Sequence, residues 1–197
     1  MTVEQRPAPP AWNRPDVRIG AAIAVALAIA FIVWLIVRGG GGSSLSSTTT
    51  TTQTPVVPAI APRLATVNEL KGLAVKVGHP IYWVGPQPGL GYELTRTSSN
   101  RIFIRYLPHG TPAGAKSVYT FVGTYPVAGA YQALKALEKQ GDTSFAVPGG
   151  GLAVYATSSP RNVYVAFPQS DVEIEVFDPS AKRARALVAS GQVQPVR

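Results

Sequence analysis

The chain of 197 residues contains no cysteine. Disulfide bonds, thiolate zinc sites and a cysteine nucleophile are therefore excluded from its chemistry. Histidine is almost as scarce, because His79 and His109 are the only two. Both lie next to a proline, and neither has a second histidine four residues away, as a helical zinc site would need. We therefore predict no metal site and no cofactor, and a fold held together by packing.

Motifs of known chemistry are also missing. The Gly-x-Ser-x-Gly pattern of a nucleophile elbow does not occur, and the glycines at 149–151 lack the spacing of a nucleotide-binding loop. Charged residues make up only 14% of the chain, yet 18 Lys and Arg outnumber 10 Asp and Glu, for a net charge of +8. The basic residues are scattered and form no dense stripe, so nucleic acid is not a predicted partner.

A long apolar run organises the sequence. It begins at Ile19, ends at Val37 and contains no charge, amide or proline. A helix of roughly 20 apolar residues crosses a hydrocarbon core of about 30 Å, so residues 19–37 are predicted to be a transmembrane helix. A cleavable signal peptide is the alternative, with small-residue sites at 26–28 and 28–30. The bulky apolar residues that follow these sites favour an uncleaved anchor.

Flanking charge predicts the orientation of this span. Arg6, Arg14 and Arg18 precede it, whereas only Arg38 follows closely. The positive-inside rule then places residues 1–18, which are rich in proline, in the cytoplasm as a disordered tail. Residues 38–63 are rich in Gly, Ser, Thr and Pro and are predicted to be a flexible linker. Residues 64–197 are expected to form one extracytoplasmic domain of a single-pass cell-membrane protein.

Helices and short strands alternate in residues 64–197. Thr66 and Glu69 have the spacing of a capping box, and Gly78 is a fitting stop for the helix that follows. Further helices are predicted at 127–140 and 180–190. Eight strand candidates lie between turn residues, at 81–84, 92–97, 101–107, 117–124, 143–147, 152–157, 163–167 and 172–177. The class predicted from this pattern is α+β, an antiparallel sheet with its helices packed on one face.

One hairpin is specific enough to predict its register. Residues 98–100, Ser-Ser-Asn, suit a three-residue turn with Asn100 in the left-handed conformation. This turn sets Tyr92 opposite Tyr106 and Glu93 opposite Arg105. One face of the hairpin is then apolar and the other carries an ion pair.

An internal repeat is a further prediction. Turn residues recur in the same order in two halves, for example 97–101, Thr-Ser-Ser-Asn-Arg, against 157–161, Thr-Ser-Ser-Pro-Arg. The domain is thus expected to contain two helix-plus-four-strand units closed by a C-terminal helix. Shared turn chemistry alone is the competing explanation.

Two classes of function follow. The favoured hypothesis is a non-enzymatic module that binds an anionic envelope polymer, a lipid headgroup or a protein, because the basic domain has no reactive motif. The predicted ligand-binding residues are Trp83, Tyr92, Tyr106, Arg105 and His109. Filling of the core is the competing interpretation of the aromatic residues. The alternative function is an envelope-acting hydrolase or transferase that uses His109 or a carboxylate.

The acidic residues Asp171, Glu173 and Glu175 alternate with apolar ones along a single predicted strand. Such a set could hold a hard cation weakly, but a calcium site normally needs six or more oxygen ligands. We therefore interpret these side chains as a solvated edge or as partners for arginine.

Overall fold

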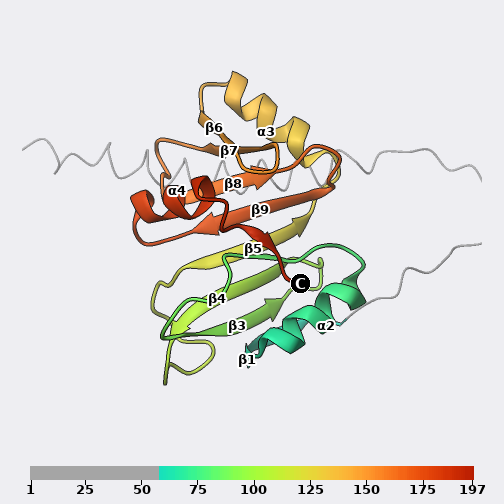
Figure 1. Cartoon of the computed structure of the whole chain (residues 1–197), viewed down its shortest axis with the longest axis vertical. Coiled ribbons are helices and arrows are strands. Elements are labelled where there is room, and N and C mark those ends of the chain that lie inside the picture. The colour runs from blue at the N-terminus through green and yellow to red at the C-terminus, as the bar shows by residue number, and fades with distance from the viewer. Residues whose placement is uncertain (1–57) are drawn as a thin grey trace, which may run out of the picture. The chain divides into compact units, whose positions relative to one another are not determined.

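The computed structural model describes residues 58–197. This part of the chain forms a large antiparallel sheet and three helices, so the predicted α+β class is confirmed (Figure 1). The predicted tail, the transmembrane helix and the linker up to residue 57 lie outside the described residues. Within 58–197, no helix combines the length and the apolar character needed to cross a membrane.

The large sheet has eight strands, and every pair of neighbours is antiparallel. In spatial order they are β1 (Ile60–Ala65), β3 (Leu90–Arg96), β4 (Ile102–Pro108), β5 (Phe121–Pro126), β9 (Val172–Phe177), β8 (Asn162–Ala166), β7 (Gly151–Tyr155) and β6 (Thr143–Val147). A separate two-stranded sheet pairs β2 (Tyr82–Trp83) with β10 (Gln194–Pro195). β1 starts inside the range predicted as linker, so the sheet begins earlier in the chain than predicted.

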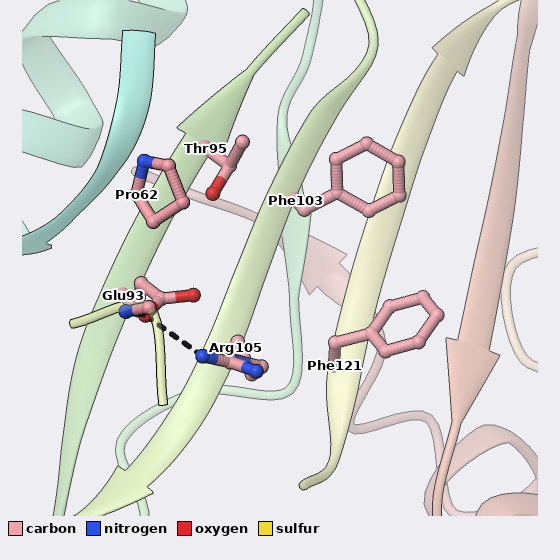
Figure 2. A pocket seen from close by; sticks show the side chains of 7 residues that line it. Pro62, Glu93, Thr95, Phe103, Arg105 and Phe121 are labelled. Atoms are coloured by element: carbon pink, nitrogen blue, oxygen red, sulfur yellow. Dashed lines mark hydrogen bonds and ion pairs between the residues drawn. The ribbon is translucent and has the colours of Figure 1, made fainter. Parts of the chain in front are cut away.

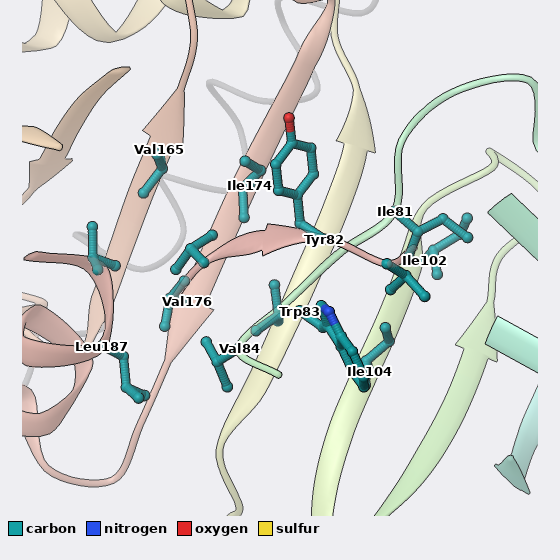
Figure 3. Close-up of a cluster of buried hydrophobic side chains, with 14 of the residues drawn as sticks. Ile81, Tyr82, Trp83, Val84, Ile102, Ile104, Val165, Ile174, Val176 and Leu187 are labelled. Carbon is teal, nitrogen blue, oxygen red and sulfur yellow. The ribbon is translucent and has the colours of Figure 1, made fainter. Parts of the chain in front are cut away.

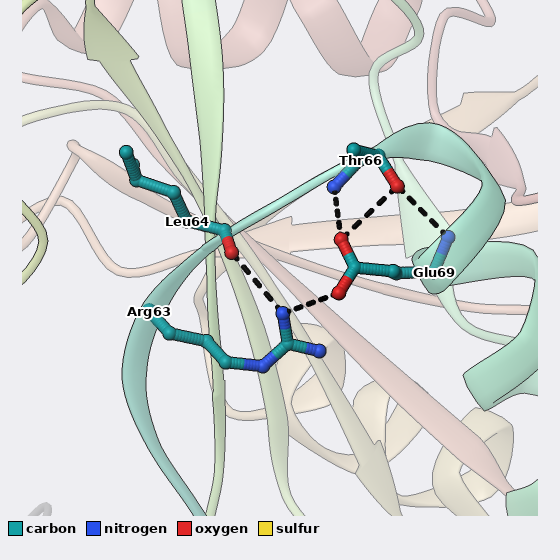
Figure 4. A network of polar contacts seen from close by, with 4 residues as sticks. All are labelled: Arg63, Leu64, Thr66 and Glu69. Atoms are coloured by element: carbon teal, nitrogen blue, oxygen red, sulfur yellow. Dashed lines mark hydrogen bonds and ion pairs between the residues drawn. The ribbon is translucent and has the colours of Figure 1, made fainter.

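Helix α2 (Val67–Val77) begins with the predicted capping box. The hydroxyl of Thr66 accepts a hydrogen bond from the Glu69 amide at 3.2 Å, and the Glu69 carboxylate accepts one from the Thr66 amide at 2.7 Å. Arg63 adds an ion pair to the same carboxylate at 2.7 Å (Figure 4). The helix ends at Gly78, which is left-handed with φ of 71°. Both ends of α2 therefore form at the residues from which they were predicted, the capping box at the start and Gly78 at the end.

The main core lies between the sheet and a layer formed by α2, α4 (Ala181–Ala189), β2 and β10. The segment from Ile81 to Val84 crosses the sheet as part of this layer, and all four of its side chains are buried (Figure 3). Its backbone is tied to the sheet by a hydrogen bond from the Tyr82 amide to the Thr124 hydroxyl, at 2.9 Å. β2 and β10 thus form a short inner ribbon that completes the core.

Helices lie on both faces of the sheet, which corrects the prediction of a single covered face. The buried side chains of α4 pack in the main core, on the same sheet face as Val163 and Val165. Helix α3 (Ala130–Lys139) instead packs its Ala130 and Leu134 on Leu152, Val154 and Ala166, which point the other way. The reason is that β7 and β8 are apolar on both faces, so each face needs a cover.

The predicted hairpin register is confirmed. Tyr92 pairs with Tyr106, Leu94 with Ile104 and Glu93 with Arg105, and Asn100 has φ of 59°. The ion pair joins Arg105 Nη2 to Glu93 Oε2 at 2.9 Å.

The two halves of the sheet resemble each other only in part. β3, β4 and β5 form one antiparallel meander, β7, β8 and β9 form another, and β5 pairs with β9 at the junction. The halves differ in the fourth strand, because β6 pairs with β7 whereas β2 pairs with β10 and leaves the edge beside β3 to β1.

Candidate functional site

The three aromatic residues predicted to bind a ligand lie together, but on the covered side of the sheet. The ring of Tyr92 contacts Trp83 at 5.6 Å and Tyr106 at 5.7 Å between centroids, both edge to face. Trp83 and Tyr106 are 6% and 2% exposed, and Tyr92 is half-buried against the same cluster. This placement matches the competing interpretation, in which these rings fill the core.

The hydroxyl of Tyr106 explains why a tyrosine stands in this core. It accepts a hydrogen bond from the Val84 amide at 2.9 Å and donates one to the Gly85 carbonyl at 3.2 Å. Burial raises the pKa of Tyr106 far above its ordinary value. The neutral hydroxyl therefore fixes the segment that follows β2.

Arg105 and His109 lie apart from these rings. Arg105 alternates with Ile104 and Tyr106 along β4, so it points to the opposite face of the sheet. His109 is exposed at the start of the loop between β4 and β5, where its amide donates a hydrogen bond to the Gly89 carbonyl at 3.3 Å. The structure therefore does not bring the five predicted residues together.

The opposite face of β3, β4, β5 and β9 carries a second set of side chains, which we call the open face. Helices α2 and α4 pack on the other side, and α3 lies mainly on β7 and β8. The open face is defined by Glu93, Thr95, Phe103, Arg105, Phe121, Tyr125, Glu173, Glu175 and Phe177. Its aromatic and polar side chains lie at the centre of the sheet.

A row of aromatic rings crosses the open face from strand to strand. Phe103 contacts Phe121 at 5.9 Å and Tyr125 at 5.6 Å, and Phe121 stacks on Phe177 at 5.2 Å. Gly123 stands opposite Phe103, and the Tyr125 ring lies where a Cβ of residue 123 would be. The missing side chain of Gly123 therefore makes room for the Tyr125 ring, while all three phenylalanines remain partly exposed.

A hollow of about 280 Å³ lies at one end of this row. It is lined by Pro62, Glu93, Thr95, Phe103, Arg105, Gly114 and Phe121. Figure 2 shows the rings of Phe103 and Phe121 side by side, with the guanidinium of Arg105 directed toward Glu93. Apolar ring surface and a charged pair thus share one small concave site.

The charged pair of the hollow has unused hydrogen-bonding capacity. Glu93 Oε2 accepts from both Arg105 Nη2 and the Gly114 amide. The guanidinium also lies 5.6 Å from the Tyr119 ring centroid, and its Nε is buried with no hydrogen-bond partner in the described part of the chain. A guanidinium has five N–H donors, so most of those of Arg105 are free of protein acceptors among residues 58–197.

Two carboxylates occupy β9 at the other end of the open face. Glu175 is 8% exposed and accepts hydrogen bonds from the Tyr125 hydroxyl and the Asn162 amide, with the Tyr164 hydroxyl at 3.5 Å. Burial and the charge of Glu175 raise the pKa of both tyrosines. These donors satisfy a carboxylate that has no basic partner within 4 Å among the described residues.

Glu173 lies two residues along the same strand and face. Burial, and then the charge of Glu175, raise the pKa of Glu173 to about 7, while Arg101 acts in the opposite direction. A carboxyl group in this range exchanges its proton near neutral pH. The interpretation of Glu173 and Glu175 as a solvated edge is therefore wrong, because β9 lies in the interior of the sheet between β5 and β8.

The residues of the open face were missed although they alternate correctly in the sequence. Phe103 and Phe121 occupy the positions between inward-facing residues of their strands. The available signal was an aromatic residue on the face expected to be polar. That signal gains meaning only when neighbouring strands are known, because Phe121 and Phe177 are far apart in the chain and pair directly.

No family model, curated protein or solved structure matches this chain. Within residues 58–197, no group of three or more His, Asp or Glu side chains is arranged to hold a metal ion. The function therefore has to be argued from the site itself.

Proposed function

We propose that this protein is a single-pass, membrane-anchored binding protein. Residues 19–37 anchor it in the cell membrane, with the N-terminus in the cytoplasm and the domain outside. The domain acts as a non-enzymatic module that binds a polymer of the cell envelope. A lipid headgroup and a protein are the alternative partners, and the binding assay below separates the lipid headgroup from the polymer.

The observation that carries this proposal is the open face. Partly exposed aromatic rings at the centre of a sheet provide apolar contact area that folding has not fully covered. Arg105 and Glu93 stand beside these rings with hydrogen-bonding capacity to spare. Arg105 thus keeps its predicted role in binding, whereas Trp83, Tyr92 and Tyr106 are assigned to the core and His109 has no assigned role.

A sedimentation assay tests the binding proposal. The full-length protein in detergent is mixed with washed, protein-free envelope polymer, and the fraction that sediments with the polymer is measured. We expect most of the protein to be retained. A chain truncated after residue 57 is the control for binding through the span or linker. Equal retention of that control, or no retention of the full chain, would contradict the proposal. Lipid vesicles are tested in parallel, and vesicle binding by the full chain beyond that of the control, without retention on the polymer, would indicate a lipid headgroup.

The carboxylates support a second candidate, an envelope-acting hydrolase or transferase. Glu173 with its raised pKa and the buried, hydrogen-bonded Glu175 have different environments, as an acid and a base of one site would need. In this proposal Glu173 takes the role predicted for His109 or a carboxylate. Release of soluble fragments from envelope polymer by the wild type, and its loss in Glu173→Gln, would favour the enzyme over the binding module.

We also infer that the domain arose by duplication of a sheet unit. The two meanders, β3–β4–β5 and β7–β8–β9, support this origin, as does the antiparallel pairing of β5 with β9 between them. The positions of α3 and α4 on opposite faces, and of β2 outside the large sheet, mean that any duplication was followed by rearrangement.

A further inference from the structure

We propose that the hollow beside Phe103 and Phe121 is a subsite for one uncharged pyranose ring of a polysaccharide. This inference rests on the proposed binding function and names the ligand class and the residues that take it. Phe103 and Phe121 would contact the apolar C–H face of the sugar. Arg105 and Glu93 would hydrogen-bond its hydroxyl groups.

The aromatic part of the site supports a flat ligand. The rings of Phe103 and Phe121 lie side by side on neighbouring strands, with 5.9 Å between centroids and 67° between planes. Figure 2 shows the two rings on neighbouring strands at the border of the hollow, and their edge-to-face arrangement leaves one ring face and one ring edge to contact a ligand. Exposed ring surface of this kind packs well against the C–H groups of a pyranose, which form an apolar face on an otherwise polar molecule.

The polar part of the site selects against a charged ligand. Glu93 would repel an anion such as a phosphate or a uronate, and Arg105 would repel a cation. The two side chains neutralise each other at 2.9 Å, yet the guanidinium has donors besides Nη2 and the buried Nε, and Glu93 Oε1 accepts no hydrogen bond among residues 58–197. A hydroxyl group both donates and accepts, so neighbouring hydroxyls of a neutral sugar match this pair. An acyl chain would leave the remaining donors and acceptors of this pair without partners and so fits poorly.

The dimensions of the site suit a single ring. A hollow of about 280 Å³ is below the usual range of drug-sized pockets, about 300–1,000 Å³. The row continues past the hollow to Phe177 on β9. A polymer could therefore place one ring in the hollow and contact Phe177 with the next, which favours an oligosaccharide over a free monosaccharide.

Calorimetric titration of the full-length protein in detergent micelles tests the assignment. The probes are a β-1,4-linked glucose hexamer, the corresponding N-acetylglucosamine hexamer and, as the anionic comparison, a galacturonate hexamer. We expect binding to at least one neutral hexamer, with an affinity that changes less than twofold between 50 and 500 mM salt, because the site carries no net charge. Binding to the galacturonate hexamer alone, or to none of the three, would overturn the sugar assignment.

Matched variants locate the site. Phe121→Leu keeps an apolar side chain but removes the ring, and we expect it to weaken binding of the neutral hexamer about tenfold. Phe145→Leu makes the same change on the other face of the sheet and should leave the affinity unchanged. Thermal unfolding confirms that both variants are folded. Equal affinities of the two variants would place the sugar elsewhere. If the wild type sediments with envelope polymer but binds no hexamer, the sugar assignment fails while the proposed binding function stands.

Discussion

Individual residues in this domain acquire their roles from the face of the sheet to which they point. Tyr106 and Arg105 are neighbours in sequence, yet one fixes the core and the other borders a solvent-accessible hollow. Trp83 is the clearest case, because an aromatic residue predicted to bind a ligand is buried against Tyr92. Its role is open to a direct measurement.

Trp83→Ala should lower the free energy of unfolding by about 3–5 kcal/mol, because it removes a buried ring and leaves a cavity. Binding to envelope polymer, measured at a low temperature where the variant is folded, should be unchanged. Phe103→Ala, which truncates a half-exposed ring, should destabilise less and bind less. The opposite pattern, with a stable Trp83 variant that no longer binds, would return Trp83 to the binding site.

Glu173 should make stability depend on pH. Its folded-state pKa of about 7 lies above the ordinary value of 4.5, so the folded protein binds this proton more tightly than the unfolded chain. The stabilising effect is present at low pH and is lost as the pH rises from about 4.5 through 7. Glu173→Gln should therefore flatten the stability profile in this window and raise the melting temperature at pH 8.

The control for this experiment is Glu138→Gln on the exposed surface of α3. It should retain the wild-type profile between pH 4.5 and 8. A Glu173→Gln profile with the wild-type slope would mean that another group is responsible for the pH dependence.

At the scale of secondary-structure elements, single capping residues at the helix termini contribute measurably to the stability of the domain. Thr66→Ala removes the hydroxyl that caps α2 and leaves the Glu69 amide without its acceptor, so we expect a loss of about 1 kcal/mol. Ser180→Ala at the start of α4 is the comparison, because Ser180 accepts a longer bond of 3.4 Å from the Arg183 amide. Urea denaturation should show the larger loss for Thr66. A larger loss for Ser180 would contradict this account of the capping box.

Elements with local determinants were predictable from sequence. The hairpin of β3 and β4 was placed correctly in register, because Asn100 fixes its turn and alternation fixes its faces. The capping box likewise fixed the start of α2. In both cases the deciding interactions join residues that are close in the chain.

Elements that depend on distant partners were not predictable. β1 contains Pro62 and lies largely within the range predicted as linker, and it becomes a strand by pairing with β3. β10 is two residues long and exists only as the partner of β2. The aromatic row and the burial of Glu175 depend in the same way on which strands are neighbours. The candidate site could therefore not be predicted from the sequence, because its side chains come together only through the order of the strands in the sheet.

At the scale of the whole molecule, the predicted topology has a simple test. Because Arg6, Arg14 and Arg18 precede the apolar run, we expect residues 39 onward to lie outside the cell. Protease added to intact cells should cleave between residues 39 and 57 and release a fragment that begins near the domain. Antibodies to the tail and to the domain identify the two products, and a cytoplasmic protein reports on lysis. Protection until the cells are lysed would reverse the orientation.

The pairing of β2 with β10 affects how the protein is made. Ile81 to Val84 lie at the centre of the core, but the Ile81 carbonyl receives its hydrogen bond from Val196. At a synthesis rate of about 5–20 residues per second, the roughly 110 residues between these partners take on the order of 10 s to appear. During that time the chain holds an apolar segment without its cover. We therefore expect the core around residues 81–84 to be completed only after residues 194–196 have been synthesised, and a chaperone that shields residues 81–84 in the meantime should raise the yield of folded protein.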